Sequence, residues 1–449
     1  MALCFCRWRN VLLCVCTPCI CLLLLFLYSG LLICMQINDS ATVTHFVASG
    51  TLRSSSFGPL PQTFWACHLQ GDAFWNNLQL AIDRHHNPVL RPNNSDMGFE
   101  NATRYETLLR PNSSNVADRN SSGRNFDKLP QQMQHFVSHM EIRDYPILIQ
   151  PDGVCGAGAK YERERPLLLM AIKSTELNLE NRQAIRRTWG KAGRVAGQKG
   201  NSSRGAEGGA YVRRVFLLGK EPPEGLNEDF PGLLRMESKL YGDILQWDFE
   251  DTFFNLTLKD VLFWSWFSGS CGRTRFVFKG DDDVFVNTPK LITYLQDQLK
   301  EPQARDTMKG FMVGNVIGAA SPVRVNSSKY FIPVSFYKGL YPAYAGGGGV
   351  VYSSLLTKRL LNTSKRVLLF PIDDVYVGMC MVRLNLCPSH HPAFLTFDFP
   401  AKEEEQPCAY HRVLLVHKRS PSEMVTLWAG LKKTATRCRD VPLRNTPQH

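Results

Sequence analysis

The later part of the chain alternates between short apolar runs and amphipathic segments. The runs 166–174 (PLLLMAIKS) and 213–219 (RRVFLLG) are typical of buried strands, and 180–190 between them has helical periodicity. Another helical pattern covers 251–267 and leads into the strand-like run 276–279 (FVFK). This alternation predicts an α/β domain with a mostly parallel sheet.

Two capping patterns mark further helices. Thr288 followed by Pro289 predicts a helix that has Thr as its cap and Pro at its first position. Near the carboxyl terminus the run 413–416 (VLLV) predicts a strand, and Ser420 with Glu423 fits a capping box. The apolar stripe of the helix after this box consists of Met424, Leu427, Trp428 and Leu431.

A long uncharged run near the amino terminus predicts a membrane anchor. Residues 11–37 contain no charge and exceed the roughly 20 residues that a membrane-spanning helix requires. A cleaved signal peptide would instead have an apolar core of only about 7 to 15 residues. Because Arg7 and Arg9 precede the run, we expect residues 1–10 in the cytosol and the rest of the chain in the secretory lumen.

Residues 38–155 have a different composition from the segments on either side. They are rich in Asn, Ser, Arg and Pro and show little periodicity outside short pieces such as 74–82. We therefore expect a partly folded stem here and the main folded domain at 156–449. Nine N-x-S/T sequons support a lumenal location, at Asn38, Asn93, Asn101, Asn112, Asn120, Asn201, Asn255, Asn326 and Asn362.

Cysteine usage and net charge narrow the class of protein. The cysteines beyond the apolar run are Cys67, Cys155, Cys271, Cys380, Cys387, Cys408 and Cys438. Their number is odd, so at least one is free or pairs between chains. They contain no C-x-x-C pair, which argues against a structural zinc site. The formal net charge of +12 would favour binding to nucleic acid, but a protein in the secretory lumen does not encounter nucleic acid. Acidic surfaces or sugar phosphates are the better partners.

Three consecutive carboxylates follow the strand-like run 276–279. Asp281, Asp282 and Asp283 lie between apolar residues, at the carboxyl end of a predicted strand, where α/β sheets bind ligands. Asp is also common in solvated turns, so a turn alone is the alternative. Adjacent carboxylates are tolerated when Mg²⁺ or Mn²⁺ neutralises them, and these ions often bridge to substrate phosphates. The pattern therefore favours a metal-bound diphosphate.

The segment FKGDDDVFVN resembles the D-x-D motif of the Golgi β-1,3-glycosyltransferases. The resemblance extends over about 165–430 through RQAIRRTW (182–189), VFLLG (215–219), DTFFNLTLK (251–259), YPAYAGGGGVVYS (341–353), PIDDVYVGMC (371–380) and LLVH (414–417). Within the family the chain is most similar to the β-1,3-N-acetylglucosaminyltransferases that extend poly-N-acetyllactosamine. The resemblance implies a single-pass type II Golgi membrane enzyme with a GT-A-type nucleotide-sugar-binding domain at 156–449.

The resemblance also implies the reaction and the ligands of the cation. N-acetylglucosamine would move from UDP-GlcNAc to a terminal β-galactose in β-1,3 linkage, with inversion and with Mn²⁺ or Mg²⁺ as cofactor. Asp283 would bind the metal, and Asp281 and Asp282 would face the donor. His417 would be the second metal ligand, although a lone histidine is more often structural.

The second acidic pair has a different implied role. Asp374 would be the general base that takes the proton from the acceptor hydroxyl, and Asp373 stands where many relatives have Glu. An acidic helix start is the alternative for both. Arg182 and Arg186 share one helical face that would border the nucleotide, unless they belong to a surface salt-bridge helix.

Acceptor contacts are implied by the segment YPAYAGGGG. Tyr341 and Tyr344 would stack on sugar rings, and Gly347 and Gly348 would permit close approach of a substrate. The alternative is a tight packing turn with core aromatics. Lys279, beside the acids, would balance charge.

Two competing functions stay open. One is a β-1,3-galactosyltransferase that uses UDP-Gal and has the same fold. The other is a non-catalytic glycan-binding partner of an active transferase, against which the intact acidic triplet, Asp374 and His417 argue. The resemblance also allows homo- or hetero-oligomers with other glycosyltransferases.

Overall fold

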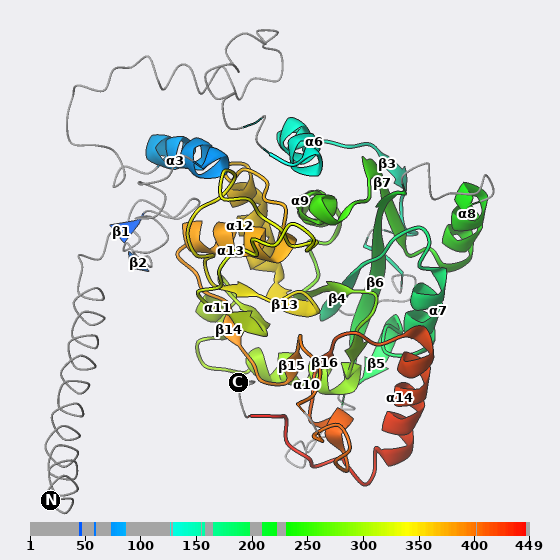
Figure 1. The fold of residues 1–449 in the computed structure, drawn as a ribbon. Coiled ribbons are helices and arrows are strands. Elements are labelled where there is room, and N and C mark those ends of the chain that lie inside the picture. Colours follow the sequence, from blue (N-terminus) through cyan, green and yellow to red (C-terminus); the bar gives the residue numbers. More distant parts are fainter. Residues whose placement is uncertain are drawn as a thin grey trace, which may run out of the picture.

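The computed structural model describes most of the chain beyond the amino-terminal region (Figure 1). The described residues are 45–46, 58–59, 73–86, 126, 129–153, 155–157, 165–197, 209–221, 230–400 and 402–445. The predicted membrane anchor at 11–37 lies outside them. Within these ranges, no helix is both long enough and apolar enough to cross a bilayer.

A nine-stranded mixed sheet forms the centre of the molecule. Its strands are β3 (Ile147–Ile149), β4 (Leu168–Lys173), β5 (Gly193–Ala196), β6 (Gly209–Lys220), β7 (Ile244–Glu250), β8 (Phe276–Asp281), β10 (Met312–Gly314), β13 (Gly349–Ser353) and β14 (Ser389–His390). The order is β14-β10-β13-β8-β4-β6-β7-β3, with β5 on β6. The central strands β8, β4, β6 and β7 are parallel, as predicted, whereas β13, β3 and β5 pair antiparallel with their neighbours.

Smaller pairings complete the strand inventory. They are β1 (His45–Phe46) with β2 (Gly58–Pro59), β11 (Val316–Ile317) with β12 (Tyr344–Ala345), and the sheet β15 (Phe394–Leu395), β16 (Leu415–Val416), β9 (Phe285–Val286). In the last of these, β16 runs antiparallel to β9. This pairing brings a late segment of the chain beside the acidic turn.

Helices pack on both faces of the sheet. One core includes residues of α3 (Phe74–His86), α6 (Gln131–His139), α9 (Leu256–Ser270), α12 (Ser354–Ser364) and α13 (Asp373–Arg383). The other includes residues of α7 (Leu179–Arg187), α8 (Phe230–Tyr241), α10 (Thr288–Gln298) and α14 (Pro421–Thr434) (Figure 1). The short helices η4 (Phe253–Asn255), α11 (Ala304–Thr307) and η5 (Ala409–His411) lie in connections.

Strand β4 shows why the apolar run at 166–174 is continuous. Leu169 and Ala171 belong to the first core, whereas Leu168, Met170 and Ile172 belong to the second. A strand that is buried on both faces needs apolar residues at every position, which is the pattern of a central parallel strand.

The predicted helix starts are partly right. Ser420 and Glu423 form the expected capping box of α14, and Met424 and Leu431 of the predicted stripe are buried. Helix α10 begins at Thr288, but its cap is Asn287, whose side chain accepts a hydrogen bond from the Lys290 backbone N–H at 3.3 Å. The prediction of Thr288 as the cap is therefore wrong, because the more strongly capping Asn stands one residue earlier.

Several described segments within 38–155 pack into the same body as the residues beyond 156. Trp75 of α3 is fully buried, and its indole N–H donates to the Leu369 carbonyl at 3.1 Å. Asp83 of the same helix forms a buried ion pair with Arg383 of α13 at 2.6 Å. Strand β3 extends the main sheet beside β7.

Two disulfides are present among the described cysteines. Cys155 is bonded to Cys271, and Cys408 is bonded to Cys438. The described free cysteines are Cys380, which is buried, and Cys387, which is exposed.

Candidate active site

Three chain segments converge at the carboxyl ends of the central strands. Strand β4 ends at Lys173, which lies in register opposite Asp281 at the end of β8. After the turn that holds the acidic triplet, β9 pairs with β16, with Val416 opposite Phe285. His417 follows β16 directly and therefore lies beside the acidic turn.

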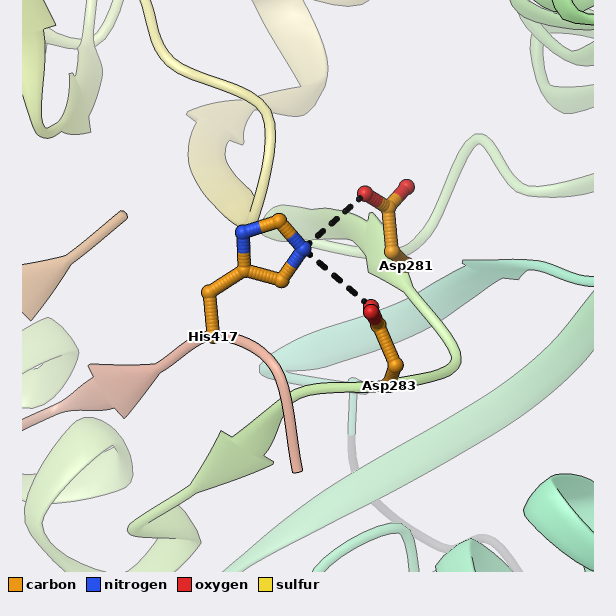
Figure 2. Close-up of side chains that lie close together, drawn as sticks. All are labelled: Asp281, Asp283 and His417. Atoms are coloured by element: carbon orange, nitrogen blue, oxygen red, sulfur yellow. Dashed lines mark ion pairs between the residues drawn. The ribbon is translucent and has the colours of Figure 1, made fainter. Parts of the chain in front are cut away.

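Asp281, Asp283 and His417 form a compact cluster (Figure 2). The His417 Nε2 atom lies 3.2 Å from Oδ1 of Asp283 and 3.8 Å from Oδ2 of Asp281. One ligand atom from each residue lies within 4.8 Å of the others. The three side chains are partly exposed, at 30% for Asp281, 43% for Asp283 and 18% for His417, so a ligand can reach them.

The donor set of this cluster fits a divalent cation. The His417 Nδ1 atom lies 3.2 Å from the Thr396 carbonyl; when Nδ1–H donates there, the Nε2 lone pair faces the two carboxylates. A metal-bound imidazole is commonly oriented in this way by its other nitrogen. Without a cation, burial lowers the pKa of His417, but hydrogen bonding to Asp283 and its charge raise it more, so the net pKa is raised. The two carboxylates therefore favour the protonated imidazole when no cation is bound.

Asp282 is separated from this cluster by its hydrogen bonds. Its carboxylate is buried and accepts from the Ser174 hydroxyl at 2.6 Å and from the Asn178 amide at 3.0 Å. Burial is the largest effect on this group and raises its pKa to about 6, against the lowering by both hydrogen bonds. Asp282 therefore fixes the acidic turn to the loop after β4. Its side chain binds Ser174 and Asn178 in place of the predicted donor contact.

The predicted nucleotide contacts of Arg182 and Arg186 are also not supported. Arg182 is 1% exposed, and its five N–H groups all have acceptors inside the protein. These acceptors are both carboxylate oxygens of Glu237, the Ser174 hydroxyl and the carbonyls of Thr175 and Glu176. No donor of Arg182 is left for a phosphate. Arg182 instead holds Ser174, which in turn binds Asp282.

Arg186 belongs to a buried ion-pair network behind the site. It pairs with Glu237 and, at 2.7 Å, with Asp243, which also pairs with Arg214 at 2.6 Å. The helical periodicity correctly placed Arg182 and Arg186 on one face. It could not indicate that acidic residues of α8 and the following turn cover that face.

The second acidic pair lies at the start of α13. Asp373 is buried and accepts from the Lys173 ammonium at 2.7 Å, and Lys279 lies 3.7 Å away. Burial raises the pKa of Asp373, but the two lysines outweigh it and hold the pKa well below its usual range. For Asp374 burial, followed by the negative charge of Asp373, raises the pKa to about 8. A carboxylate with that pKa is suited to accept a proton near neutral pH.

Lys173 connects the two acidic groups, and no sequence motif indicated this role. Its ammonium lies 2.9 Å from Asp281 and 2.7 Å from Asp373. Burial lowers the pKa of Lys173, but these carboxylates outweigh that effect and raise it, so the lysine stays charged. A lysine at the end of an otherwise apolar strand is the signal that could have been read. Lys279 also balances charge, but its partner is buried Asp260 at 2.6 Å and not the adjacent acidic triplet.

The glycine run lies against both parts of the site. A Cβ added at Gly347 would lie 2.8 Å from Oδ2 of Asp374, and one added at Gly348 would lie 2.9 Å from the Cβ of His417. Neighbouring Cα atoms are about 3.8 Å apart, so Asp374 and His417 lie beside adjacent residues of one backbone segment. Glycine is required at these positions by the site residues themselves, and the predicted close approach of a substrate to Gly347 and Gly348 stays a prediction.

We expect Gly347→Ala to reduce turnover by about 100-fold, because a misplacement of roughly 1 Å at a reacting group has that scale of effect. The new methyl group would displace the Asp374 carboxylate. Gly269→Ala is the matched control, since a Cβ there has nothing within 4 Å. Steady-state kinetics of both variants test this, and equal turnover in the two would contradict the proposed contact.

The two tyrosines predicted to contact an acceptor differ in access. Tyr341 is 6% exposed and packs among Tyr337 and Phe370, with ring centroids 5.5 and 5.7 Å away. Its ring therefore belongs to the core, and stacking on a sugar is excluded by these contacts. Tyr344 is half-buried and packs against α13, where a Cβ at Gly378 would lie 3.0 Å from its Cβ. Gly378 is one helical turn beyond Asp374, so Tyr344 lies on the Asp374 side of this helix.

Comparison with known proteins places this site in a family. The family model described as Galactosyltransferase matches residues 180–392, which include the acidic triplet and the acidic pair of α13. Human N-acetyllactosaminide beta-1,3-N-acetylglucosaminyltransferase 2 is 40% identical over 378 residues, covering 84% of this chain and 89% of that protein. Human UDP-GlcNAc:betaGal beta-1,3-N-acetylglucosaminyltransferase 9 is 43% identical over 318 residues, covering 67% and 74%. The chain therefore belongs to the galactosyltransferase family and groups there with the β-1,3-N-acetylglucosaminyltransferases.

Proposed function

We propose that this chain transfers N-acetylglucosamine from UDP-GlcNAc to a terminal β-galactose in β-1,3 linkage, with inversion at the anomeric carbon. The names of the relatives at about 40% identity support this donor and acceptor. One observation carries the proposal: Asp374 lies against Gly347 and His417 lies against Gly348. A carboxylate with a raised pKa is therefore close to the cluster of carboxylates and imidazole that could hold a cation.

In this mechanism Asp374 transfers the proton, and Asp373 and Lys173 hold fixed charges around it. Asp374 accepts the proton of the acceptor hydroxyl as the oxygen attacks the anomeric carbon. Asp373 stays ionised between Lys173 and Lys279, and its charge keeps the pKa of Asp374 high enough for this role. Lys173 holds Asp281 and Asp373 at fixed distances, so the donor side and the acceptor side keep one geometry.

Asp281, Asp283 and His417 would hold a divalent cation, Mn²⁺ or Mg²⁺, in a GT-A-type arrangement. When bound, that cation supplies Lewis-acid stabilisation of the diphosphate leaving group. The two carboxylates and the imidazole provide oxygen and nitrogen ligands for it.

The location of the enzyme is part of the same proposal. The uncharged run 11–37 after Arg7 and Arg9 supports a type II anchor in the Golgi membrane, with the site in the lumen. The nine sequons support the same side of the membrane.

A donor comparison tests the reaction. The full chain, solubilised in detergent, is offered a lactosamine acceptor with UDP-GlcNAc or UDP-Gal, each with and without Mn²⁺. Turnover with UDP-GlcNAc that requires Mn²⁺ is the expected result. Turnover with UDP-Gal alone would make the chain a β-1,3-galactosyltransferase, and no turnover from folded protein would indicate a non-catalytic glycan-binding partner.

We expect Asp283→Ala to weaken Mn²⁺-dependent binding of UDP by at least about tenfold, which corresponds to roughly 1.4 kcal/mol. The variant removes a carboxylate that lies 3.2 Å from the remaining ligand His417. Calorimetric titration of UDP with and without Mn²⁺ measures the change. Asp297→Ala, at an exposed carboxylate of α10 whose ion-pair partner is Lys300, is the matched control. Unchanged Mn²⁺ dependence in Asp283→Ala would remove this residue from the cation site.

A further inference from the structure

A groove lies at the edge of the molecule between α6, η4 and the loop that joins β11 to β12. Its volume is about 510 Å³, including its open mouth. The lining residues that matter here are Gln132, Met133, Phe254, Ser328, Lys329 and Phe331. Apolar rings and a methionine thus line the groove together with amide, hydroxyl and ammonium groups.

An aromatic platform adjoins this groove. The rings of Phe253 and Tyr330 meet edge to face with centroids 5.2 Å apart. The Lys329 ammonium lies 5.1 Å from both ring centroids. Tyr330 is 44% exposed, which is a large exposed area for an aromatic side chain. Aromatic faces with a polar rim are the surfaces that bind the apolar faces of sugar rings while their hydroxyls find partners.

The loop that lines the groove begins and ends beside the active site. Strand β11 pairs with β12 so that Ile317 is opposite Tyr344, and residues 318–343 therefore leave and return beside Tyr344. Tyr344 packs against α13 one turn from Asp374. Burial raises the pKa of Tyr344 to about 12, and Asp374 and Tyr330 add to it, so Tyr344 lies within electrostatic reach of both.

The loop is held rigidly enough to form a binding wall. The Arg324 guanidinium donates to the carbonyls of Ile332 and Tyr337, the latter at 2.9 Å. The backbone N–H groups of Phe74 and Trp75 in α3 donate to Ser335 and Phe336 at 2.8 and 2.9 Å. A preformed wall binds with a smaller loss of conformational entropy than a mobile loop.

We propose that this groove binds the inner sugar residues of an extended acceptor glycan, while the terminal galactose lies beside Asp374. The proposal rests on the transferase function proposed above and specifies its substrate as a chain longer than one disaccharide. Segments that precede residue 156 form one wall of the groove, through Gln132 and Met133 of α6. Part of the expected stem would thus contribute to acceptor choice.

The test compares acceptor length in the wild type and in Tyr330→Ala. The full chain is assayed with lactosamine disaccharide and with a hexasaccharide of three lactosamine units, and kcat/KM is measured for each. We expect the wild type to prefer the hexasaccharide. Tyr330→Ala should reduce the ratio of the two values by about 3- to 10-fold, the scale of one lost aromatic contact. Leu240→Ala, at a 73% exposed position of α8, is the control and should keep the wild-type ratio.

Two outcomes would overturn the inference. The first is that wild type and Tyr330→Ala both transfer to the disaccharide and have the same ratio of kcat/KM for the hexasaccharide to kcat/KM for the disaccharide. If the wild type transferred to neither acceptor, the proposed function itself would be refuted. The second concerns Asn326, a sequon residue that also lines the groove. If Asn326→Gln from a glycosylating host loses thermal stability and Tyr330→Ala does not change acceptor preference, the groove holds the chain's own glycan.

Discussion

We expect Asp374→Asn to lower kcat by about 100- to 10,000-fold, the usual contribution of a general base. The amide has nearly the same shape but cannot take a proton from the acceptor hydroxyl. Asp281, Asp283 and His417 keep their mutual contacts in this variant, because none of the ion pairs that hold them involves Asp374. Binding of UDP and of the cation should therefore remain.

The same variant separates a catalytic role from a structural one. Burial raises the pKa of Asp374 to about 8. At any pH above the ordinary pKa of an aspartate, this carboxyl group therefore lowers the free energy of unfolding, because the unfolded chain ionises more readily than the folded one. Removing that charge should leave stability at pH 8 unchanged or higher, while activity falls. Kinetics, UDP calorimetry and thermal unfolding on one preparation measure all three quantities. Transfer near the wild-type rate would refute the assignment of the base, and Asp248→Asn, at a 42% exposed carboxylate, is the control for the substitution itself.

Local pattern predicted that the residues of the Asp281, Asp283 and His417 cluster lie at strand ends, and the family resemblance implied the metal role of Asp283 and His417. Asp281 was expected to face the donor, and the structure brings it into the same cluster. The acidic triplet follows a strand, and His417 follows the next-to-last apolar run, so each residue was predicted to lie at a strand end. The antiparallel pairing of β16 with β9 then joins the two ends. The strand ends could be predicted because α/β folds gather ligands there, but the pairing of β16 with β9 that joins them could not be predicted from local pattern.

The charge network behind the cluster could not be predicted in this way. Lys173 meets Asp373 only because β4 lies beside β8 and because α13, 200 residues later, begins at the same edge. Arg182 finds Glu237 in the same manner, 55 residues along the chain. Periodicity shows which face of an element is apolar or charged, but the residue that covers that face depends on sheet order and register.

Composition was similarly limited for the segment before residue 156. Asn, Ser and Pro dominate it, and that composition favours a stem. Trp75 and Asp83 nevertheless form buried contacts with partners 294 and 300 residues away. Contacts at such separations leave no periodic signal, because α3 contributes one short buried face to a core that later segments build.

Substitution of Lys173, which sequence patterns did not single out, should strongly reduce the stability of the fold. We expect Lys173→Met to lower the free energy of unfolding by about 3 to 5 kcal/mol, since removing one partner of a buried ion pair leaves an uncompensated charge. Asp373 would lose its 2.7 Å partner and keep only Lys279 at 3.7 Å. Chemical denaturation without reductant measures the loss. Lys300→Met, at an exposed ion pair, should change stability by less than about 1 kcal/mol.

A double variant decides whether the charge of Asp373 is the cause. In Lys173→Met/Asp373→Asn both charges are absent, and replacement of both members of a buried pair is often close to neutral. We therefore expect the double variant to be more stable than Lys173→Met alone, with a coupling free energy of about 1 to 3 kcal/mol. If the two single losses simply add, Lys173 would stabilise the fold through packing of its side chain. In that case Asp373 would not need Lys173 to stay ionised, and the remaining partner Lys279 would be sufficient to keep its charge beside Asp374.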